Sequence, residues 1–251
     1  MTGMLASVAS VDEAALALAG GADLIDLKDP AAGALGALPM ATIRAAVRLV
    51  SGRRRLSATV GDRVTDPAAL AGAVARTAAA GVDFVKVGFA AGADHHALAG
   101  ALAGEAARGT AIVAVLFADR DVDFTLLRRL AACGFTGAML DTADKNGVSL
   151  RRCMDEARLG RFVDGARSLG LLSGLAGSLG PEDVAPLMAL GPDYLGFRGA
   201  LCGGGERRAG LDPDRLRAIR ALVRPSAPPV IPARPPAAPP PPPGRTAPPI
   251  P

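Results

Sequence analysis

Short aliphatic runs alternate with longer alanine-rich stretches along most of the 251-residue chain. The short runs have the length of fully buried strands, and the longer stretches repeat apolar residues at helical spacing. The predicted strands cover residues 4–8, 24–28, 56–62, 83–89, 111–119, 137–142, 171–180 and 193–200. Strict alternation of aliphatic strands with helices predicts a parallel sheet, and eight such units predict a closed α/β barrel, the (β/α)8 TIM barrel.

The helices between the strands begin at recognisable capping sites. Ser10 is followed by Glu13 three residues later, which has the form of a capping box. Pro39 and Pro181 suit the start of a helix, because proline lacks the N–H group that would be unpaired there. Further helices are predicted from residue 39 to about residue 50 and over 66–80, 94–107, 122–132, 149–168 and 212–223.

One sequence phrase recurs four times, as AGGADLIDLKDP, AAGVDFVKVGF, ACGFTGAMLDTADK and ALGPDYLGFRG. In each copy a glycine that can end a helix precedes a mostly aliphatic run with a charged residue near its end. These glycines are Gly21, Gly81, Gly134 and Gly191. The copies lie roughly 55–60 residues apart, about the length of two βα units. The repeat therefore agrees with eight strands.

Composition divides the chain into two parts. Residues 225–251 contain 14 of the 21 prolines and cannot build a core, so we expect residues 1–224 to form the catalytic barrel and residues 225–251 a disordered tail. No apolar run is long enough to span a bilayer, and the N-terminus has no secretory pattern, which favours a cytoplasmic protein. Three cysteines at no disulfide or metal spacing agree with a reducing compartment.

Charge and aromatic content limit the partners. The net charge is +4, but only 3% of the residues are aromatic, so few side chains could stack on nucleic-acid bases. His95 and His96 are adjacent and lack the helical spacing of a metal-binding pair. We therefore expect a small-molecule partner, no nucleic acid, no membrane and no metal, while the sequence leaves a homo-oligomer open.

Lysine is rare in this chain and occurs where chemistry is expected. Of 28 basic residues only Lys28, Lys86 and Lys145 are lysines, and each lies at, near or just past the end of a predicted strand. An ammonium group can lose its proton and attack a carbonyl, whereas a guanidinium group cannot. Drift of lysine to arginine could also leave three lysines by chance, but their common position favours a functional role.

Strand parity places these lysines together with acidic residues. Counted from the helix-ending glycines, Asp26 and Lys86 lie at offset five, and Lys28, Asp141 and Arg198 at offset seven. Because the offsets share one parity, all five side chains should point into the barrel near its C-terminal mouth, where active sites of such barrels form. Lys145, four residues beyond Asp141, should lie over the same mouth. The structural alternative is a set of buried Lys–Asp pairs that only neutralise each other.

These groups predict imine chemistry on a phosphorylated sugar. Neighbouring amines and burial depress the pKa of a lysine, which then attacks a carbonyl, while an aspartate or a second lysine moves protons. Glycines in the last two strand-to-helix loops would let backbone N–H groups approach a phosphate. The predicted phosphate contacts are Gly177, Ser178, Arg198 and Gly199.

The sequence resembles the (5-formylfuran-3-yl)methyl phosphate synthase family of the methanofuran pathway. The resemblance covers about residues 1–222 and rests on the stretches MLASVASVDEAALALAGGADLIDLKDPAAGALGA, FVKVGF, MLDTADKNG and YLGFRGALCGG. It implies condensation of two glyceraldehyde 3-phosphate molecules with loss of phosphate and water. By similarity Lys28 would form the Schiff base and Lys86 would accept a proton, with Asp26, Asp141 and Lys145 as supporting charged residues.

The residues themselves leave alternatives open. A different Schiff-base aldolase would use the same lysines, and a phosphosugar isomerase or epimerase would move protons without an imine. A barrel that only binds a phosphorylated metabolite is a third reading. In the imine mechanism no cofactor or metal is expected, because the imine withdraws electrons as a Lewis acid would.

Overall fold

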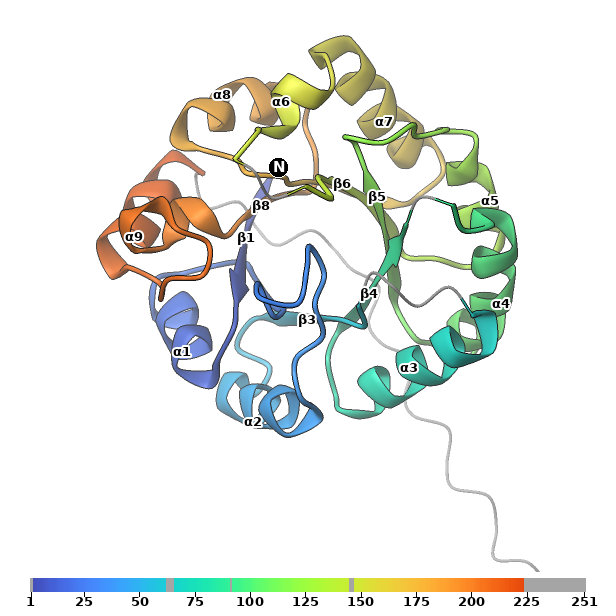
Figure 1. The fold of residues 1–251 in the computed structure, drawn as a ribbon, viewed down its shortest axis with the longest axis horizontal. Helices are drawn as coiled ribbons and strands as arrows, with labels where there is room; N and C mark the ends of the chain where they lie inside the picture. Colours follow the sequence, from blue (N-terminus) through green and yellow to red (C-terminus); the bar gives the residue numbers. More distant parts are fainter. Residues whose placement is uncertain (1, 62–65, 91, 145–146, 224–251) are drawn as a thin grey trace, which may run out of the picture.

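The computed structural model in Figure 1 describes residues 2–61, 66–90, 92–144 and 147–223. Within them eight parallel strands close into a barrel in the order β1 to β8, and the helices form a ring around it. The predicted TIM barrel is therefore confirmed. The strands are β1 Gly3–Val8, β2 Leu24–Leu27, β3 Arg55–Thr59, β4 Phe84–Phe89, β5 Ile112–Phe117, β6 Gly137–Asp141, β7 Leu172–Leu175 and β8 Tyr194–Phe197.

Helices alternate with the strands as predicted, except that two helices, α6 and α7, follow β6. They are α1 Val11–Ala19, α2 Met40–Val50, α3 Pro67–Ala79, α4 His95–Ala107, α5 Leu126–Ala132, α6 Leu150–Cys153, α7 Glu156–Ser168, α8 Pro181–Ala189 and α9 Pro213–Leu222, with 3₁₀ turns η1 Gly199–Leu201 and η2 Gly203–Gly205 after β8. The four predicted helix-ending glycines all have positive φ, for example 79° at Gly21 and 95° at Gly81. Among the described residues, no helix is both long and apolar enough to cross a bilayer.

Four local predictions differ from the structure for identifiable reasons. The helix predicted over 149–168 is broken at Met154, whose backbone is extended, and α7 starts anew after its cap Asp155. The helix predicted from residue 122 begins later because the Asp123 carboxylate accepts hydrogen bonds from Thr125 N and Oγ1 and holds a turn there. The strand predicted over 171–180 ends at Leu175, since positive φ angles at Gly177 and Ser178 turn the chain into a loop.

The fourth difference concerns the predicted capping box. Ser10 Oγ does accept a hydrogen bond from Glu13 N, at 3.1 Å. The Glu13 carboxylate instead accepts from Ala9 N, at 2.7 Å, and turns toward the barrel. The Glu13 carboxylate is therefore directed away from the helix cap and toward Arg198.

The barrel interior changes from apolar to polar along the strands. A cluster of apolar side chains fills the interior, namely Leu5, Leu24, Ala34, Leu35, Phe84, Val115, Phe117, Met139, Ala176 and Tyr194. Next along the strands, Ser7, Asp26 and Ser57 are register partners on β1, β2 and β3. A second and larger apolar layer packs the strands against the helices. Leu5, Leu24 and Phe84 lie two residues before Ser7, Asp26 and Lys86 on their strands and form an apolar floor below the polar layer, whereas Phe117 pairs with Asp141 at the level of the mouth.

Two glycines inside β7 and β8 serve this packing. A Cβ at Gly174 would lie 2.9 Å from Met139 Cγ, and one at Gly196 would lie 2.9 Å from Met139 Cε. These glycines on β7 and β8 therefore make room for Met139 inside the barrel. The predicted tail and Lys145 lie outside the described residues.

Candidate active site

A buried ion pair lies at the centre of the polar layer. Lys86 Nζ lies 3.0 Å from Asp26 Oδ2, and the two side chains are 3% and 0% exposed. Ser57 Oγ donates to Asp26 Oδ1 at 2.5 Å, and Ser7 Oγ donates to Oδ2 at 3.2 Å. Three donors from three strands thus hold one carboxylate, and the structure brings Asp26 and Lys86 together as their offsets predict.

The environment of Asp26 keeps it ionised. Burial alone would raise its pKa, because a carboxylate is poorly solvated inside the barrel. The positive charges of Lys86 and Lys28 and the Ser57 hydrogen bond act in the opposite direction, and together they hold the pKa of Asp26 below its usual value. Asp26 is therefore a fixed negative charge that stabilises a neighbouring ammonium, rather than a proton donor.

Lys28 and Asp141 form a looser pair beside this centre. Lys28 Nζ lies 3.9 Å from Asp141 Oδ2, longer than a direct charge-assisted hydrogen bond of about 2.7–2.9 Å. Asp141 Oδ1 accepts from Thr142 N at 2.7 Å, which fixes the carboxylate at the end of β6. Both side chains are buried, at 7% and 3% exposure. The Lys28–Asp141 contact is therefore longer than the Lys86–Asp26 pair, which lies at 3.0 Å.

A cavity of about 550 Å³ opens over these side chains at the C-terminal mouth of the barrel. Lys28, Lys86 and Asp141 line it together with residues of the two loops that follow β7 and β8. The lining residues from these loops include Gly177, Ser178, Gly180, Arg198, Gly199, Gly205, Glu206 and Arg207. Among the described residues no group of three His, Cys, Asp or Glu side chains is arranged to hold a metal ion.

The β7–α8 loop reaches the cavity in an unusual conformation. Gly177 has φ 115°, and a Cβ there would lie 2.9 Å from Thr142 Cγ2 and 3.0 Å from Thr142 N. Glycine is thus required both by the backbone angle and by the neighbouring loop. Ser178 follows with φ 48° and is exposed to the cavity. Gly177, Ser178 and Gly199 lie on the cavity wall, and their phosphate contacts stay a prediction.

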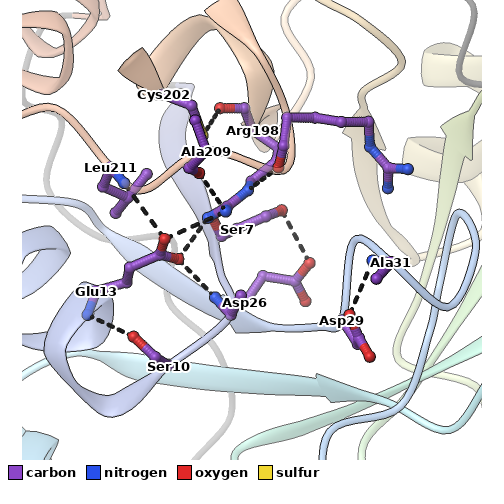
Figure 2. Close-up of polar contacts among 12 residues, drawn as sticks. Ser7, Ser10, Glu13, Asp26, Asp29, Ala31, Arg198, Cys202, Ala209 and Leu211 are labelled. Carbon is purple, nitrogen blue, oxygen red and sulfur yellow. Dashed lines mark hydrogen bonds and ion pairs between the residues drawn. The ribbon is translucent and has the colours of Figure 1, made fainter.

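Arg198 is buried and lines the cavity, as its offset predicts, but its guanidinium is already engaged by the protein. Its guanidinium binds the Glu13 carboxylate through Nη1–Oε2 at 2.5 Å and Nη2–Oε1 at 3.2 Å (Figure 2). The other donors reach Ser7 O, Arg207 O and Ala209 O. Because arginine has five N–H donors, all of them are used by protein acceptors. Arg198 therefore connects β8 with α1 and with the loop before α9, and a phosphate could reach it only by displacing one of these contacts.

Four residues of this region have roles that were not predicted from the sequence. Ser7 and Ser57 hold Asp26, Glu13 holds Arg198, and Arg207 lines the cavity. The two serines could have been found, because they occupy inward positions on strands adjacent to Asp26. Arg207 follows the glycines after β8 but belongs to no strand, so parity could not assign it.

Two buried lysines and two aspartates below a glycine-rich wall at the C-terminal mouth define the class of this protein as a (β/α)8-barrel enzyme. The chain belongs to the 4-HFC-P synthase family, whose sequence model matches residues 4–220.

Named relatives align with this chain over nearly their whole length. The (5-formylfuran-3-yl)methyl phosphate synthase of Methanothermobacter thermautotrophicus is 36% identical over 231 residues, covering 88% of this chain and 98% of its own. That of Methanopyrus kandleri is 39% identical over 220 residues, covering 82% and 92%. A Methylorubrum extorquens protein that carries this name provisionally is 50% identical over 220 residues, covering 87% and 91%.

Solved structures with low sequence identity share the fold. Phosphoribosyl anthranilate isomerase from Thermus thermophilus superposes with a TM-score of 0.62 at 14% identity, covering 89% of this chain and 98% of its own. 3-Hexulose-6-phosphate synthase from Salmonella typhimurium gives 0.62 at 15% identity, covering 88% and 98%. At such identities the likeness shows the barrel alone.

Proposed function

We propose that this protein condenses two glyceraldehyde 3-phosphate molecules into (5-formylfuran-3-yl)methyl phosphate through a Schiff base at Lys28, as a step in building a methanofuran-type cofactor. The observation that carries the proposal is the pair of buried lysines in one cavity, each beside its own carboxylate. The names of the relatives supply the product.

The two lysines suit different roles. Lys28 lines the cavity, lies 3.9 Å from Asp141 and is 7% exposed, against 3% for Lys86, so its amine lies nearer to an entering aldehyde. Lys86 lies deeper and within 3.0 Å of the ionised Asp26. In the proposed reaction the Lys86 ammonium first gives its proton to the hydroxyl that leaves as water when the imine forms. The neutral amine then accepts the substrate proton, and Asp26 stabilises the ammonium that forms again. Lys28 is therefore the nucleophile and Lys86 the proton acceptor.

The first steps build an enamine. Lys28 Nζ adds to the aldehyde carbon of one triose phosphate, and a water leaves as the protonated imine forms. The imine withdraws electrons from C2, and Lys86 takes the C2 proton. The electron pair of that C–H bond becomes the C1–C2 double bond of the enamine, which makes C2 nucleophilic.

The carbon skeleton of the product places the new bond. In the furan one triose keeps its phosphate on a CH₂ branch, and the other keeps its aldehyde. C2 of the bound triose therefore joins C3 of the second triose, whose phosphate leaves with the bonding electrons. The C2 hydroxyl oxygen of the second triose then attacks the imine carbon. Loss of the C2 hydroxyl of the bound triose as water and expulsion of the Lys28 amine give the aromatic ring, with one phosphate and two waters released and no oxidant consumed.

The proposal is tested by incubating the protein with glyceraldehyde 3-phosphate, with and without borohydride. We expect a furan-aldehyde ultraviolet absorbance without reductant, and with reductant a mass adduct that maps to Lys28. Lys28→Arg keeps a cation beside Asp141 but cannot form an imine, so it should lose both signals.

Other outcomes select the alternatives. An adduct without furan would indicate another Schiff-base aldolase. Substrate turnover without an adduct would indicate an isomerase or epimerase, and binding without turnover a non-catalytic barrel. An adduct and furan that both persist in Lys28→Arg would contradict the assignment of Lys28.

A further inference from the structure

A second guanidinium, that of Arg207, lines the cavity from the loop between η2 and α9. The backbone of this loop is fixed from below, because Arg198 donates to Arg207 O at 2.8 Å and to Ala209 O at 2.9 Å. Arg198 is itself held by Glu13. The base of the Arg207 side chain thus rests on a buried ion pair between β8 and α1.

The side chain of Arg207 connects two loops of the mouth. Its Nη2 donates to Gly33 O at 3.0 Å, in the segment that joins β2 to α2. Gly33 lies five residues after Lys28 in the sequence, and the charges of Asp141 and Asp29 act on Arg207. Arg207 is therefore on the same side of the mouth as the Lys28–Asp141 pair.

Most of the hydrogen-bonding capacity of Arg207 is unused by the protein. Of its five N–H donors, one is taken by Gly33 O, and the residues that the structure describes supply no acceptor for the other four. The side chain is half-buried, and this burial lowers the pKa of Arg207, an effect that Asp141 opposes. A partly desolvated cation with unused donors in a cavity is suited to an anion.

We propose that Arg207 binds the phosphate of the triose phosphate that reacts at Lys28. The inference rests on the proposed function for its phosphorylated substrate and deepens it, because that reaction needs sites for two phosphates. The loop with Gly177 and Ser178 lies on the cavity wall formed by β7 and is left for the phosphate of the second triose. Arg207 therefore orients the bound triose and holds the β8–α9 loop to the β2–α2 loop.

Binding of a substrate analogue that cannot react tests this assignment without the chemistry. Isothermal titration would compare glycerol 3-phosphate with glycerol on the full chain, for the wild type, Arg207→Gln, Arg207→Lys and Arg208→Gln. Arg208 is the matched control, because it is the next residue in the loop, is exposed and does not line the cavity.

We expect Arg207→Gln to weaken glycerol 3-phosphate binding by about 10- to 100-fold, the usual effect of losing a charge-assisted hydrogen bond. The affinity of Arg207→Lys for glycerol 3-phosphate should lie between those of the wild type and Arg207→Gln, since a lysine keeps the charge but not the bidentate geometry. Arg208→Gln should stay within about twofold of the wild type. Borohydride trapping of unphosphorylated glyceraldehyde at Lys28 should be equal in all four proteins, which checks that the variants fold.

Unchanged binding in Arg207→Gln would overturn the inference and leave the proposed condensation standing. An equal loss in Arg208→Gln would overturn it too, because the effect would then be one of overall charge. A wild-type protein that binds glycerol 3-phosphate no better than glycerol would overturn both the inference and the phosphorylated substrate.

Discussion

Replacing Glu13 by glutamine should make the barrel easier to unfold and should loosen the loop that carries Arg207 at the mouth. The Glu13 carboxylate accepts hydrogen bonds from two donors of Arg198 and from the N–H groups of Ala9 and Leu211. An amide has only one oxygen, so its NH₂ group must face one or more of these donors. The guanidinium of Arg198 would then be buried without a counter-charge.

The burial of the pair sets the size of the effect. The side chains of Glu13 and Arg198 are 12% and 7% exposed, so water replaces little of the lost interaction. Removing one partner of a buried ion pair typically costs about 3–5 kcal/mol of stability, because the remaining charge stays uncompensated. We expect Glu13→Gln to lose an amount in this range.

Urea unfolding followed by circular dichroism would measure the free energy of unfolding. Asp164→Asn is the control, because the Asp164–Arg167 pair is 73% and 59% exposed and should contribute little. The same two variants would be assayed for glycerol 3-phosphate binding, where only Glu13→Gln should be weakened. A loss below about 1 kcal/mol in Glu13→Gln would refute the view that this pair anchors the loop.

Three further changes test the site and its floor. Asp26→Asn should destabilise the protein most at neutral pH. Because the pKa of Asp26 is lowered in the folded state, the ionised carboxylate stabilises the fold above about pH 4, and this stabilisation is lost as the pH falls through the folded-state pKa. The difference in free energy of unfolding between the wild type and Asp26→Asn, measured by urea unfolding, should therefore narrow on acidification. A gap that stays constant down to about pH 2 would contradict this. Lys86→Met should keep the borohydride adduct at Lys28 but slow furan formation, measured by absorbance, by about 10²- to 10⁴-fold. Loss of the adduct would show that Lys86 is needed for imine formation itself. Gly196→Ala should lower the free energy of unfolding by about 1–3 kcal/mol, because the added methyl group contacts Met139. Met139→Ala should then destabilise Gly196→Ala less than it destabilises the wild type. Equal destabilisation in the two backgrounds would contradict this contact.

Repetition of the βα unit made the fold predictable from sequence. Helix-ending glycines set the start of each strand, and the aliphatic runs fixed its parity, so Asp26 and Lys86 could be placed face to face although they lie 60 residues apart. Local side-chain hydrogen bonds were not predictable in the same way. Asp123 delays α5 and Asp155 restarts α7 through contacts that leave the helical periodicity unchanged.

The loops of the mouth were less predictable because their residues follow no period. Arg207 reaches the cavity only through the turns of η1 and η2 and through the anchor at Arg198. Nothing in the spacing of the arginine pair at 207 and 208 separates the residue that lines the cavity from the one that faces solvent. Strand parity therefore predicts the site residues that lie on strands but not those that lie on loops.

Lys28 and Arg198 show what parity predicts beyond the end of a strand and what it leaves open. Each lies one residue beyond the last residue of its strand, at the same offset from a helix-ending glycine. Lys28 N still donates to Val8 O at 3.0 Å, so the sheet geometry continues and its side chain lines the cavity. Arg198 also lines the cavity, but its carbonyl accepts from Leu201 N in the next turn and its guanidinium is bound by Glu13. The offset therefore places both side chains at the mouth, and the neighbouring acceptors decide whether the cation stays available to a ligand.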